Sequence, residues 1–285
     1  MRKLLLAGAT LFALAQADRA WADDMQTGGY AVYNWAGPYA GVNLGVDWGH
    51  STITPYQGVP FPAFFNTIPG VGIIIVPAQI ATLPSVSGSA TSIIGGGQAG
   101  WNWQNGPWVF GIEGDIDGTG LDTKASSTLS RTTLAGTQTV TANIAADINW
   151  MASLRGRIGY AWGSGLYYAT GGLALAGTSV NTAYSITEPV QPPGIGPFPQ
   201  TAADSHTIPG WTVGGGGEWA LGGGWQKWTV GVEYRHTDLG NHDYNLGFSD
   251  ASIAPFNGIG GVEPTTAKVH FTEDQVTLRL NFHWN

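Results

Sequence analysis

The sequence contains no cysteine, so disulfide bonds and thiolate metal sites are excluded. It is also poor in charge: Asp, Glu, Lys and Arg make up 11% of its 285 residues, and the formal net charge is −8. Because an acidic chain with few basic residues is repelled by phosphate backbones, no nucleic-acid partner is expected. No apolar run reaches the roughly 18 residues that a transmembrane helix needs, so a membrane-spanning fold would have to be a closed β-barrel.

The N-terminus has the pattern of an export signal. Arg2 and Lys3 precede an apolar segment, and residues 20–22 (AWA) have the small-x-small spacing of a signal-peptidase site. The apolar segment is too short to span a bilayer as a stop-transfer helix. We therefore predict a signal peptide over residues 1–22, an N-terminal periplasmic segment over 23–34 and a single β-barrel domain over 35–285.

Alternation of apolar and polar residues is what the sequence has in abundance. The C-terminal stretch from Val276 to Trp284 places its apolar residues on one face of an extended strand. Seven further stretches alternate as well, at residues 37–50, 92–104, 108–118, 143–161, 166–177, 210–221 and 228–240, and in 166–177 the pattern is too weak to assign the two faces. In the fourth of these, the pattern assigns Ile144 and Ile148 to the outward face and Asp147 to the inward face.

The connections between these stretches alternate in length. Three short segments of turn-forming residues, NGP, WGSG and GGGW, each join two neighbouring stretches. The other connections, near residues 51–88, 119–141, 178–206 and 241–268, are long. Short turns on one side and long loops on the other are typical of a membrane barrel. The predicted fold is all-β, an eight-stranded antiparallel up-and-down transmembrane β-barrel with short periplasmic turns and long extracellular loops.

Tryptophan is placed where such a barrel would meet the lipid headgroups. Eight tryptophans fall at or beside the predicted short turns, and we assign them to an aromatic girdle: Trp101, Trp103, Trp108, Trp162, Trp219, Trp225, Trp228 and Trp284. A secreted soluble β-sandwich is the alternative fold class, and this outward belt argues against it.

The opposite face of the predicted strands carries charges of both signs. The predicted inward residues are Asp47, Glu113, Asp115, Asp117, Arg155, Arg157, Glu218, Glu233, Arg235, Glu273 and Arg279. An eight-stranded barrel is just wide enough for side chains to fill it. We interpret these residues as a network of ion pairs that plugs the lumen, with Arg155 and Arg157 as its hubs. The functional alternative is a narrow path for water or small solutes.

Five histidines fall near the predicted loop-side ends of neighbouring strands: His50, His206, His236, His242 and His270. Imidazoles that gather near carboxylates bind zinc or copper, so these residues are weak candidates for a metal site. Their spacing matches no dedicated metal motif, and the simpler interpretation is separate, hydrated side chains. Ser249, His242 and Asp243 are nominally available for catalysis, but no nucleophile-turn motif positions them, and neither an enzymatic activity nor a cofactor is expected.

The long loops are where a specific contact surface is expected. The first includes Phe61, Phe65 and Ile73, and it is apolar and rich in proline. It either packs over the barrel mouth against the third loop or forms an exposed partner surface. The second, residues 119–141, is rich in threonine and is expected to extend the barrel as a hairpin above the membrane.

Several stretches together resemble a known family: GPYAGVNLG, QAGWNWQ, LRGRIGYAW, ATGGLA, GWTVGGGGEWAL and VEYRHTDLG. They look like the small eight-stranded outer-membrane β-barrel proteins of alphaproteobacteria, the porin-family or opacity-type outer-membrane proteins. The resemblance covers nearly all of residues 33–285 outside the long loops. The family ends in an aromatic residue that resembles a signal to the barrel-assembly machinery; here Trp284 is followed by Asn285.

The resemblance implies a bacterial outer-membrane location, with outer-membrane lipid and lipopolysaccharide around the barrel. The implied function is structural and surface-presenting, through envelope integrity and loop-mediated contact with a partner that the sequence does not identify. A narrow porin is the alternative, and an outer-membrane enzyme or a metal-binding rim is a further one. The family name porin does not by itself imply a pore.

Overall fold

The structure is a computed structural model, and it describes residues 33–55, 59–61, 64–76, 79–134, 136–187, 200–246 and 266–284. The predicted signal peptide and most of the predicted periplasmic segment lie outside the described residues. Among the described residues no helix is long and apolar enough to cross a membrane. The strands are β1 (Gly37–Pro55), β2 (Val59–Phe61), β3 (Phe64–Ile68), β4 (Gly72–Val76), β5 (Gln79–Ala81), β6 (Val86–Asn105), β7 (Trp108–Thr133), β8 (Gly136–Trp162), β9 (Gly165–Thr187), β10 (Gln200–Ala220), β11 (Trp228–Asn245) and β12 (Thr266–His283), with a short 3-10 helix η2 (Gly223–Trp225).

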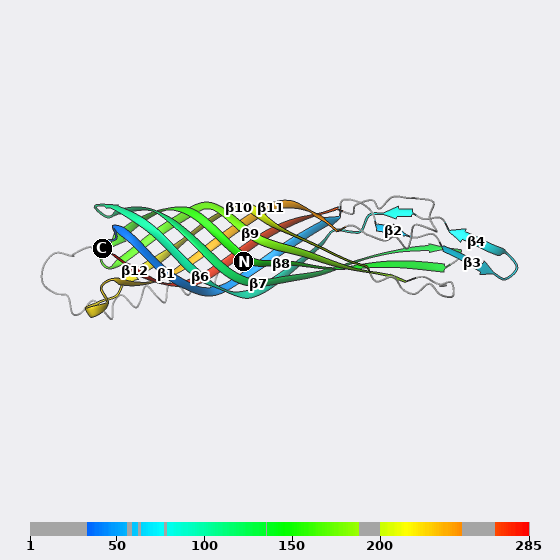
Figure 1. Cartoon of the computed structure of the whole chain (residues 1–285), viewed down its shortest axis with the longest axis horizontal. Coiled ribbons are helices and arrows are strands. Elements are labelled where there is room, and N and C mark those ends of the chain that lie inside the picture. The colour runs from blue at the N-terminus through cyan, green and yellow to red at the C-terminus, as the bar shows by residue number, and fades with distance from the viewer. Residues whose placement is uncertain are drawn as a thin grey trace. The chain divides into compact units, whose positions relative to one another are not determined.

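Eight of these strands form one closed antiparallel barrel, in the order β1, β6, β7, β8, β9, β10, β11 and β12 (Figure 1). The last strand pairs with the first, from Tyr39 opposite His283 to Pro55 opposite Ala267. Closure satisfies the backbone groups that an open sheet edge would leave exposed. The predicted fold class is therefore confirmed. Within the first long connection, β2 pairs with β5 and β3 pairs with β4.

Three connections are tight, and they join β6 to β7, β8 to β9 and β10 to β11, as the sequence predicted. Gly106 and Gly163 each have a φ of 60° in the first two of these turns. A side chain strains the backbone at positive φ, so glycine is the residue that suits these positions. We call the end of the barrel that carries these turns the tight-turn end.

The strands are longer than the sequence pattern indicated, and the extra length lies away from the tight-turn end. β7 and β8 continue as a paired hairpin through residues 119–141, where the hydroxyls of Ser130 and Thr139 hydrogen-bond at 2.8 Å. The threonine-rich second loop is thus the expected hairpin. The third-loop residues 188–199 lie outside the described residues, so the packing of the first loop on the third stays a prediction.

The barrel interior changes character along its axis. Toward the tight-turn end the inward side chains are charged, and we call this part the lumen. Farther along, the inward side chains are apolar, and they form a buried core that includes Leu121, Leu239 and Phe271. The outside changes in the opposite sense: Leu44 and Leu278 are exposed around the lumen, whereas polar residues cover the part beyond, which we call the extension. The outer surface of the barrel around the lumen is therefore suited to contact lipid, and the outer surface of the extension is suited to contact water.

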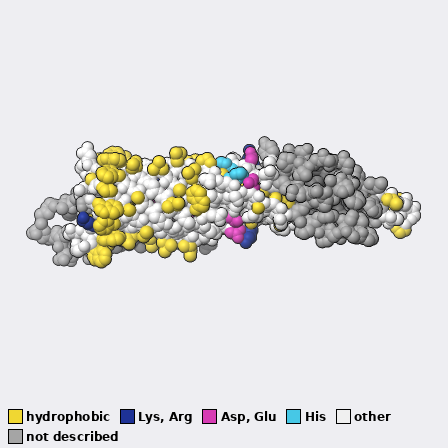
Figure 2. All heavy atoms as spheres, viewed as in Figure 1, with side chains coloured by type: hydrophobic (Ala, Val, Ile, Leu, Met, Phe, Trp, Pro, Cys, Tyr) yellow, Lys and Arg dark blue, Asp and Glu magenta, His cyan; other side chains and the backbone are white. Residues whose placement is uncertain are grey.

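Figure 2 shows the same division on the surface. Hydrophobic side chains cover the barrel near the tight-turn end, and acidic and histidine side chains gather where this cover ends.

Register irregularities lie where the lumen meets the extension. They occur in β7 between Gly118 and Leu121, in β8 between Ile148 and Trp150, and in β11 between Asp238 and Gly240. In β8 and β11 the extra residue exchanges the faces on which later side chains lie, whereas in β7 the inward face keeps its parity from Asp117 to Leu121.

The bulge in β8 corrects one sequence-based assignment. Arg155 faces the lumen, but beyond the extra residue Asn149 the inward positions are Ile148 and Ile144, which are buried, while Asp147 belongs to the outward set. The outward assignment of Ile144 and Ile148 was wrong because strict alternation takes no account of an inserted residue.

Candidate functional site

The residues predicted to line the lumen are all buried in the structure, and they come from six of the eight barrel strands. They are Asp47, Glu113, Asp115, Asp117, Arg155, Arg157, Glu218, Glu233, Arg235, Glu273 and Arg279. Their side chains converge because alternation directs every second residue of each strand toward the barrel axis.

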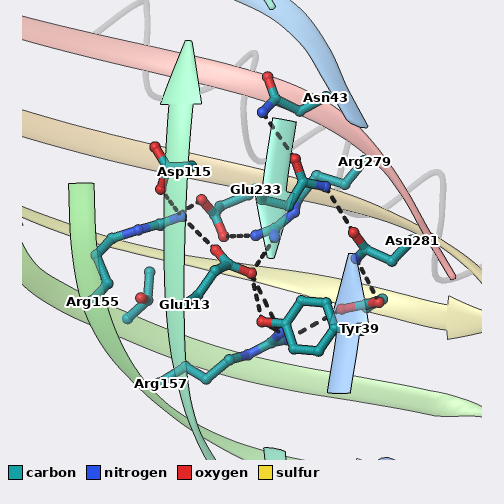
Figure 3. Close-up of polar contacts among 12 residues, drawn as sticks. Tyr39, Asn43, Glu113, Asp115, Arg155, Arg157, Glu233, Arg279 and Asn281 are labelled. Atoms are coloured by element: carbon teal, nitrogen blue, oxygen red, sulfur yellow. Dashed lines mark hydrogen bonds and ion pairs between the residues drawn. The ribbon is translucent and has the colours of Figure 1, made fainter. Parts of the chain in front are cut away.

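Four of these residues form a closed ring of alternating charge (Figure 3). Arg155 Nη2 donates to Glu113 Oε1 at 2.5 Å, and Arg155 Nη1 donates to Glu233 Oε1 at 2.7 Å. Arg279 donates to the remaining oxygen of each of these two glutamates. Each carboxylate therefore lies between two guanidinium groups, the arrangement in which a desolvated ion pair is most favourable.

Arg157 extends this ring toward the tight-turn end. It donates to Tyr39 Oη at 2.8 Å and to Glu218 Oε2 at 3.2 Å, and its guanidinium lies over the ring of Tyr168 at 4.0 Å. Tyr39 in turn donates to Glu113 at 2.6 Å. Contacts of this kind, a guanidinium on an aromatic face with a carboxylate beside it, suit arginine and not lysine.

Arg235 extends the ring in the other direction. Its two terminal nitrogens donate to Asp115 Oδ1 at 2.9 Å and to Asp117 Oδ2 at 2.8 Å, and one of them also donates to Gln275 at 3.0 Å. The ring and these extensions fill the cross-section of the lumen with side chains.

Further polar residues complete the network, and the sequence analysis did not include them among the site residues. They are Tyr39, Asn43, Gln98, Tyr168, Gln275, Asn281 and His283, and each donates or accepts a hydrogen bond inside the barrel. Asn281 and His283 share strand parity with Arg279, so the alternation already placed them inward. Charge alone was therefore too narrow a criterion for the lumenal set.

An aromatic cluster closes the lumen at the tight-turn end. The Trp35 ring is fully buried and lies 4.8 Å from the ring of Tyr33 and 5.6 Å from that of His283, measured between centroids. Tyr39 stacks on His283 at 5.2 Å. The segment that precedes β1 thus turns inward, and Trp35 is anchored by a 2.7 Å hydrogen bond from its backbone N–H to Gln104.

The predicted girdle residues lie on the outer surface near the tight-turn end. Six of them are exposed, namely Trp101, Trp103, Trp108, Trp162, Trp225 and Trp284, whereas Trp219 and Trp228 are half-buried. A second aromatic set lies farther along the strands: Trp48, Trp150, Trp211 and Tyr234. Two such belts bound the apolar band that a bilayer covers.

The five rim histidines do not converge. Three of them each contact their own aspartate: His206 with Asp204 at 3.0 Å, His236 with Asp274 at 2.8 Å, and His270 with Asp238 at 3.0 Å. His50 contacts Ser89, and His242 donates to the carbonyl of Leu239. Within the described ranges no group of three or more His, Cys, Asp or Glu side chains is placed to bind a metal ion. Ser249 lies outside those ranges.

The extension contains a pair of aspartates whose pKa values are shifted in opposite directions. Asp122 and Asp147 face each other across β7 and β8, beyond Trp150 and so outside the membrane-spanning part. Burial, together with the hydrogen bond and charge of Asp122, raises the pKa of Asp147 to about 6. Lys124 lies 2.6 Å from Asp122 and helps to lower the pKa of that carboxyl. A groove of about 740 Å³ adjoins this pair on β7 to β10, and Lys124, Asn143, Asn181 and Thr201 are among its lining residues.

Known proteins match this chain along most of its length. The family model described as outer membrane protein beta-barrel domain matches residues 4–254. The chain is 30% identical over 219 residues to the 31 kDa outer-membrane immunogenic protein of Brucella melitensis biotype 1, and the match covers 74% of each protein. It is also 30% identical over 153 residues to the 22 kDa outer membrane protein of Rhizobium leguminosarum bv. viciae, a match that covers 53% of this chain and 56% of that one.

Among solved structures, the outer membrane protease OmpT from Escherichia coli is similar with a TM-score of 0.39 and 8% identity, over 91% of this chain and 99% of that one. The names of the Brucella and Rhizobium relatives state an outer-membrane location and no enzymatic activity.

Proposed function

The chain belongs to the outer membrane protein beta-barrel domain family, and from that premise we propose that it is a closed barrel which anchors and presents its extension at the cell surface. Its location is the bacterial outer membrane. The proposed work is structural and surface-presenting, and it involves neither transport through the lumen nor catalysis.

The observation that carries this proposal is the filled lumen. Water or a solute crossing the barrel would have to pass the aromatic cluster around Trp35, the charged ring of Arg155 and Arg279, and the apolar core of the extension. Arg155 and its three carboxylate partners have side-chain exposures of 1–2%. Opening a path would break several desolvated ion pairs at once, and each broken pair costs about 3 to 5 kcal/mol. A narrow porin is therefore the less favoured function.

The extension supports the surface-presenting part of the proposal. Its apolar core and polar outside are the distribution of a water-soluble β-protein, so it is suited to stand beyond the bilayer. The hairpin of β7 and β8 ends at Leu134, which is largely exposed. The groove on β7 to β10 is lined mainly by apolar side chains such as Ile144 and Ala202, with Lys124 beside them, and we propose it as a contact surface for a partner.

The proposed partners of the barrel wall follow from its outer surface. Outer-membrane lipid and lipopolysaccharide would cover the apolar band between the two aromatic belts. We further propose that the barrel-assembly machinery recognises β12 and the residue after it, because the outward rings of Phe282 and Trp284 have centroids 5.2 Å apart. No reaction is proposed for the chain, because the Brucella and Rhizobium relatives carry no enzymatic name.

Single-channel conductance of the refolded chain in a planar bilayer tests the closed lumen. We expect a silent bilayer, while a heat-shifted gel band shows that the same preparation is folded. A general porin inserted under identical conditions is the positive control. Discrete, reproducible current steps from the folded protein would overturn the proposal in favour of the narrow porin.

Surface presentation is tested separately with an epitope tag. A tag inserted after Leu134, at the tip of the extension, should be accessible to antibody on intact cells. The matched control is the same tag after Gly163, in a tight turn, which should be accessible only after the outer membrane is permeabilised. The reverse pattern would contradict the proposed orientation.

A further inference from the structure

The connection between β1 and β6 contains an uncharged two-stranded ribbon. It leaves the extension at Pro55 and returns at Val86, so it lies on the side of the barrel away from the tight turns. β2 pairs with β5 and β3 pairs with β4, so the connection folds back on itself. Residues 51–112 include no Asp, Glu, Lys, Arg or His. The ribbon is therefore a neutral part of an otherwise acidic chain.

The hairpin of β3 and β4 ends in a tight turn with open space around it. The Val71 N–H donates to the carbonyl of Ile68 at 3.0 Å, and Gly70 has a φ of 81°. These are the features of a type II turn, with Pro69 at its second position. A Cβ added at Gly70 or Gly72 would have no described neighbour within 4 Å. The backbone of the turn is thus fixed by the hairpin itself, and its outer surface is accessible.

Large apolar side chains lie exposed at this turn. Val71 has 70% of its surface exposed and Ile73 has 69%, while Ile68 and Ile74 are half-buried. Because neighbouring residues of a strand alternate between its faces, Ile73 lies on the opposite face of the hairpin from Ile74. The register places Ile68 on the same face as Ile74. Apolar side chains therefore occupy the turn and both faces, and exposed apolar surface of this kind indicates a contact.

A lipid surface fits this distribution better than a groove on a protein. A groove covers one face of a hairpin, whereas Val71, Ile73 and Ile74 leave the water together only in surroundings that enclose the turn. The acyl boundary of a bilayer encloses a shallowly inserted turn in this way. Two requirements for insertion are also met. The strands β3 and β4 pair with each other through their backbones, and residues 51–88 contain no charged side chain that would have to lose its hydration.

The extension separates this hairpin from the bilayer that surrounds the barrel. Trp48 belongs to the second aromatic belt, and β1 continues beyond it to Pro55 before the connection begins. A lipid surface that the turn reaches on this side is therefore a different membrane. The chain has a net charge of −8 and the ribbon has no cation, so anionic headgroups would repel the protein whereas zwitterionic headgroups would not.

We propose that the turn of the β3–β4 hairpin inserts into the surface of a second, zwitterionic lipid bilayer, the membrane of another cell. This inference rests on the proposed surface-presenting function and names the partner that the presented hairpin contacts. Val71 and Ile73 enter the acyl boundary, and the uncharged ribbon of β2 to β5 connects them to the extension. The contact is one of apolar area, so it is independent of salt.

The test uses the fact that the chain contains no cysteine. Val71→Cys gives a single site for an NBD fluorophore, and the labelled protein is held in a nanodisc after a heat-shifted gel band has shown that it is folded. Addition of phosphatidylcholine vesicles should raise the NBD emission several-fold and shift it to shorter wavelength. Brominated lipid in the vesicles should quench it. Leu134→Cys, 87% exposed at the end of the β7–β8 hairpin, is the matched control and should not respond.

A second measurement removes the apolar surface without a label. Val71→Ser combined with Ile73→Ser should reduce the co-flotation of protein nanodiscs with phosphatidylcholine vesicles several-fold. The heat-shifted band should remain, because both side chains are exposed. Leu134→Ser is the matched control and should float as the parent does. Equal co-flotation of the double variant and the parent would overturn the proposal.

The other outcomes are equally decisive. Unchanged NBD emission at Val71→Cys in the presence of vesicles overturns the proposal. A blue shift that precedes the vesicles and grows with protein concentration assigns the hairpin to a second copy of the chain. Quenching by brominated lipid in the nanodisc, and not in the vesicle, assigns it to the barrel's own bilayer. A tag after Leu134 that is accessible on intact cells leaves the proposed function standing in each of these cases, whereas an inaccessible tag contradicts that function itself.

Discussion

Arg155 and Glu233 form an ion pair across the lumen: Arg155 Nη1 lies 2.7 Å from Glu233 Oε1, although β8 and β11 are not neighbours in the barrel. A contact between non-neighbouring strands does not arise from sheet hydrogen bonding. It depends on the small barrel diameter, which lets a long side chain reach the far wall. The pair therefore contributes both to holding the walls together and to closing the lumen.

The first prediction concerns this pair. Arg155→Met removes the charge while keeping most of the side-chain volume, and it leaves Glu113, Asp115 and Glu233 buried with less compensation. We expect a loss of about 3 to 5 kcal/mol in the free energy of unfolding. Urea unfolding of the refolded protein in detergent, followed by tryptophan fluorescence, gives this difference.

A double-mutant cycle isolates the contact itself. Glu233→Gln alone should also destabilise the barrel, because it removes the charge of one of the two carboxylates that Arg155 and Arg279 share. The double variant should be less destabilised than the sum of the two single variants. Strict additivity would show that the two residues do not interact energetically across the lumen.

The second prediction concerns the aromatic cluster at the tight-turn end. Trp35→Ala removes a fully buried indole that packs on Tyr33 and His283, and we expect it to cost about 3 to 5 kcal/mol of stability. The bilayer should nevertheless remain silent, because the charged ring and the apolar core still close the lumen. Trp162→Ala, at an exposed girdle position, is the control and should cost much less. Current steps from folded Trp35→Ala would show that the aromatic cluster is the sole barrier.

The third prediction concerns the bulge in β11. Gly240 has a φ of 71° and its N–H donates to Asp238 Oδ1 at 2.8 Å, while a Cβ added there would meet nothing within 4 Å. Any cost of Gly240→Ala therefore comes from backbone conformation, and we expect about 1 to 2 kcal/mol. Gly222→Ala is the matched control, because Gly222 also has open space but an ordinary φ of −83°. Equal stability of the two variants would contradict this explanation.

The part of the barrel around the lumen could be predicted from the sequence because its side chains alternate regularly between a lipid-facing and a lumen-facing environment. Lipid outside and a charged interior impose strict alternation of apolar and charged residues, so Glu113, Asp115 and Asp117 together indicate the inward face of one strand. The glycines in the short connections indicated the tight turns. The order of strands and their closure then followed from the short and long connections.

The extension could not be predicted in the same way, because its alternation is reversed and weakened. The outward residues of the extension are largely Ser, Thr and Asn, which are also common in loops. The strands predicted from the sequence were therefore shorter than those of the structure. The inserted residue Asn149 reverses the alternation of β8, so the sequence pattern assigned Ile148 to the outward face although its side chain faces inward. Trp35 was also missed as a lumenal residue, because it precedes β1 and belongs to no alternating strand.

The fourth prediction concerns assembly in the cell. If the assembly machinery recognises the outward aromatic residues at the end of β12 and just after it, Trp284→Ala should reduce the folded, heat-modifiable fraction in outer membranes several-fold. Refolding of the same variant in detergent should remain close to that of the parent, because Trp284 is exposed. Trp162→Ala, another exposed tryptophan at the tight-turn end, should leave both yields unchanged. A parallel loss in both settings would indicate a folding defect instead.

The fifth prediction concerns pH and the Asp122–Asp147 pair. The pKa of Asp147 is raised to about 6 by burial and by Asp122, so the folded protein binds this proton more tightly than the unfolded chain does. The resulting stability is complete below about pH 4 and is lost as the pH rises toward 6. Because Asp147 is partly exposed, solvent screening limits the effect to about 1 kcal/mol. Asp147→Asn should therefore be more stable than the parent above pH 6 and should lack this pH dependence in urea unfolding.

Asp204 provides a control of opposite sign. Burial raises the pKa of its carboxyl, but hydrogen bonds from the N–H of Asn245 and from His206 outweigh burial and lower the pKa overall. Because the pKa of Asp204 is lowered on folding, its carboxylate stabilises the folded state at pH values above the pKa of the unfolded chain, and this contribution is lost in acid. Asp204→Asn should therefore destabilise the protein at neutral pH. If both variants shift stability in the same direction at pH 7, the carboxyl equilibria assigned to the extension are wrong.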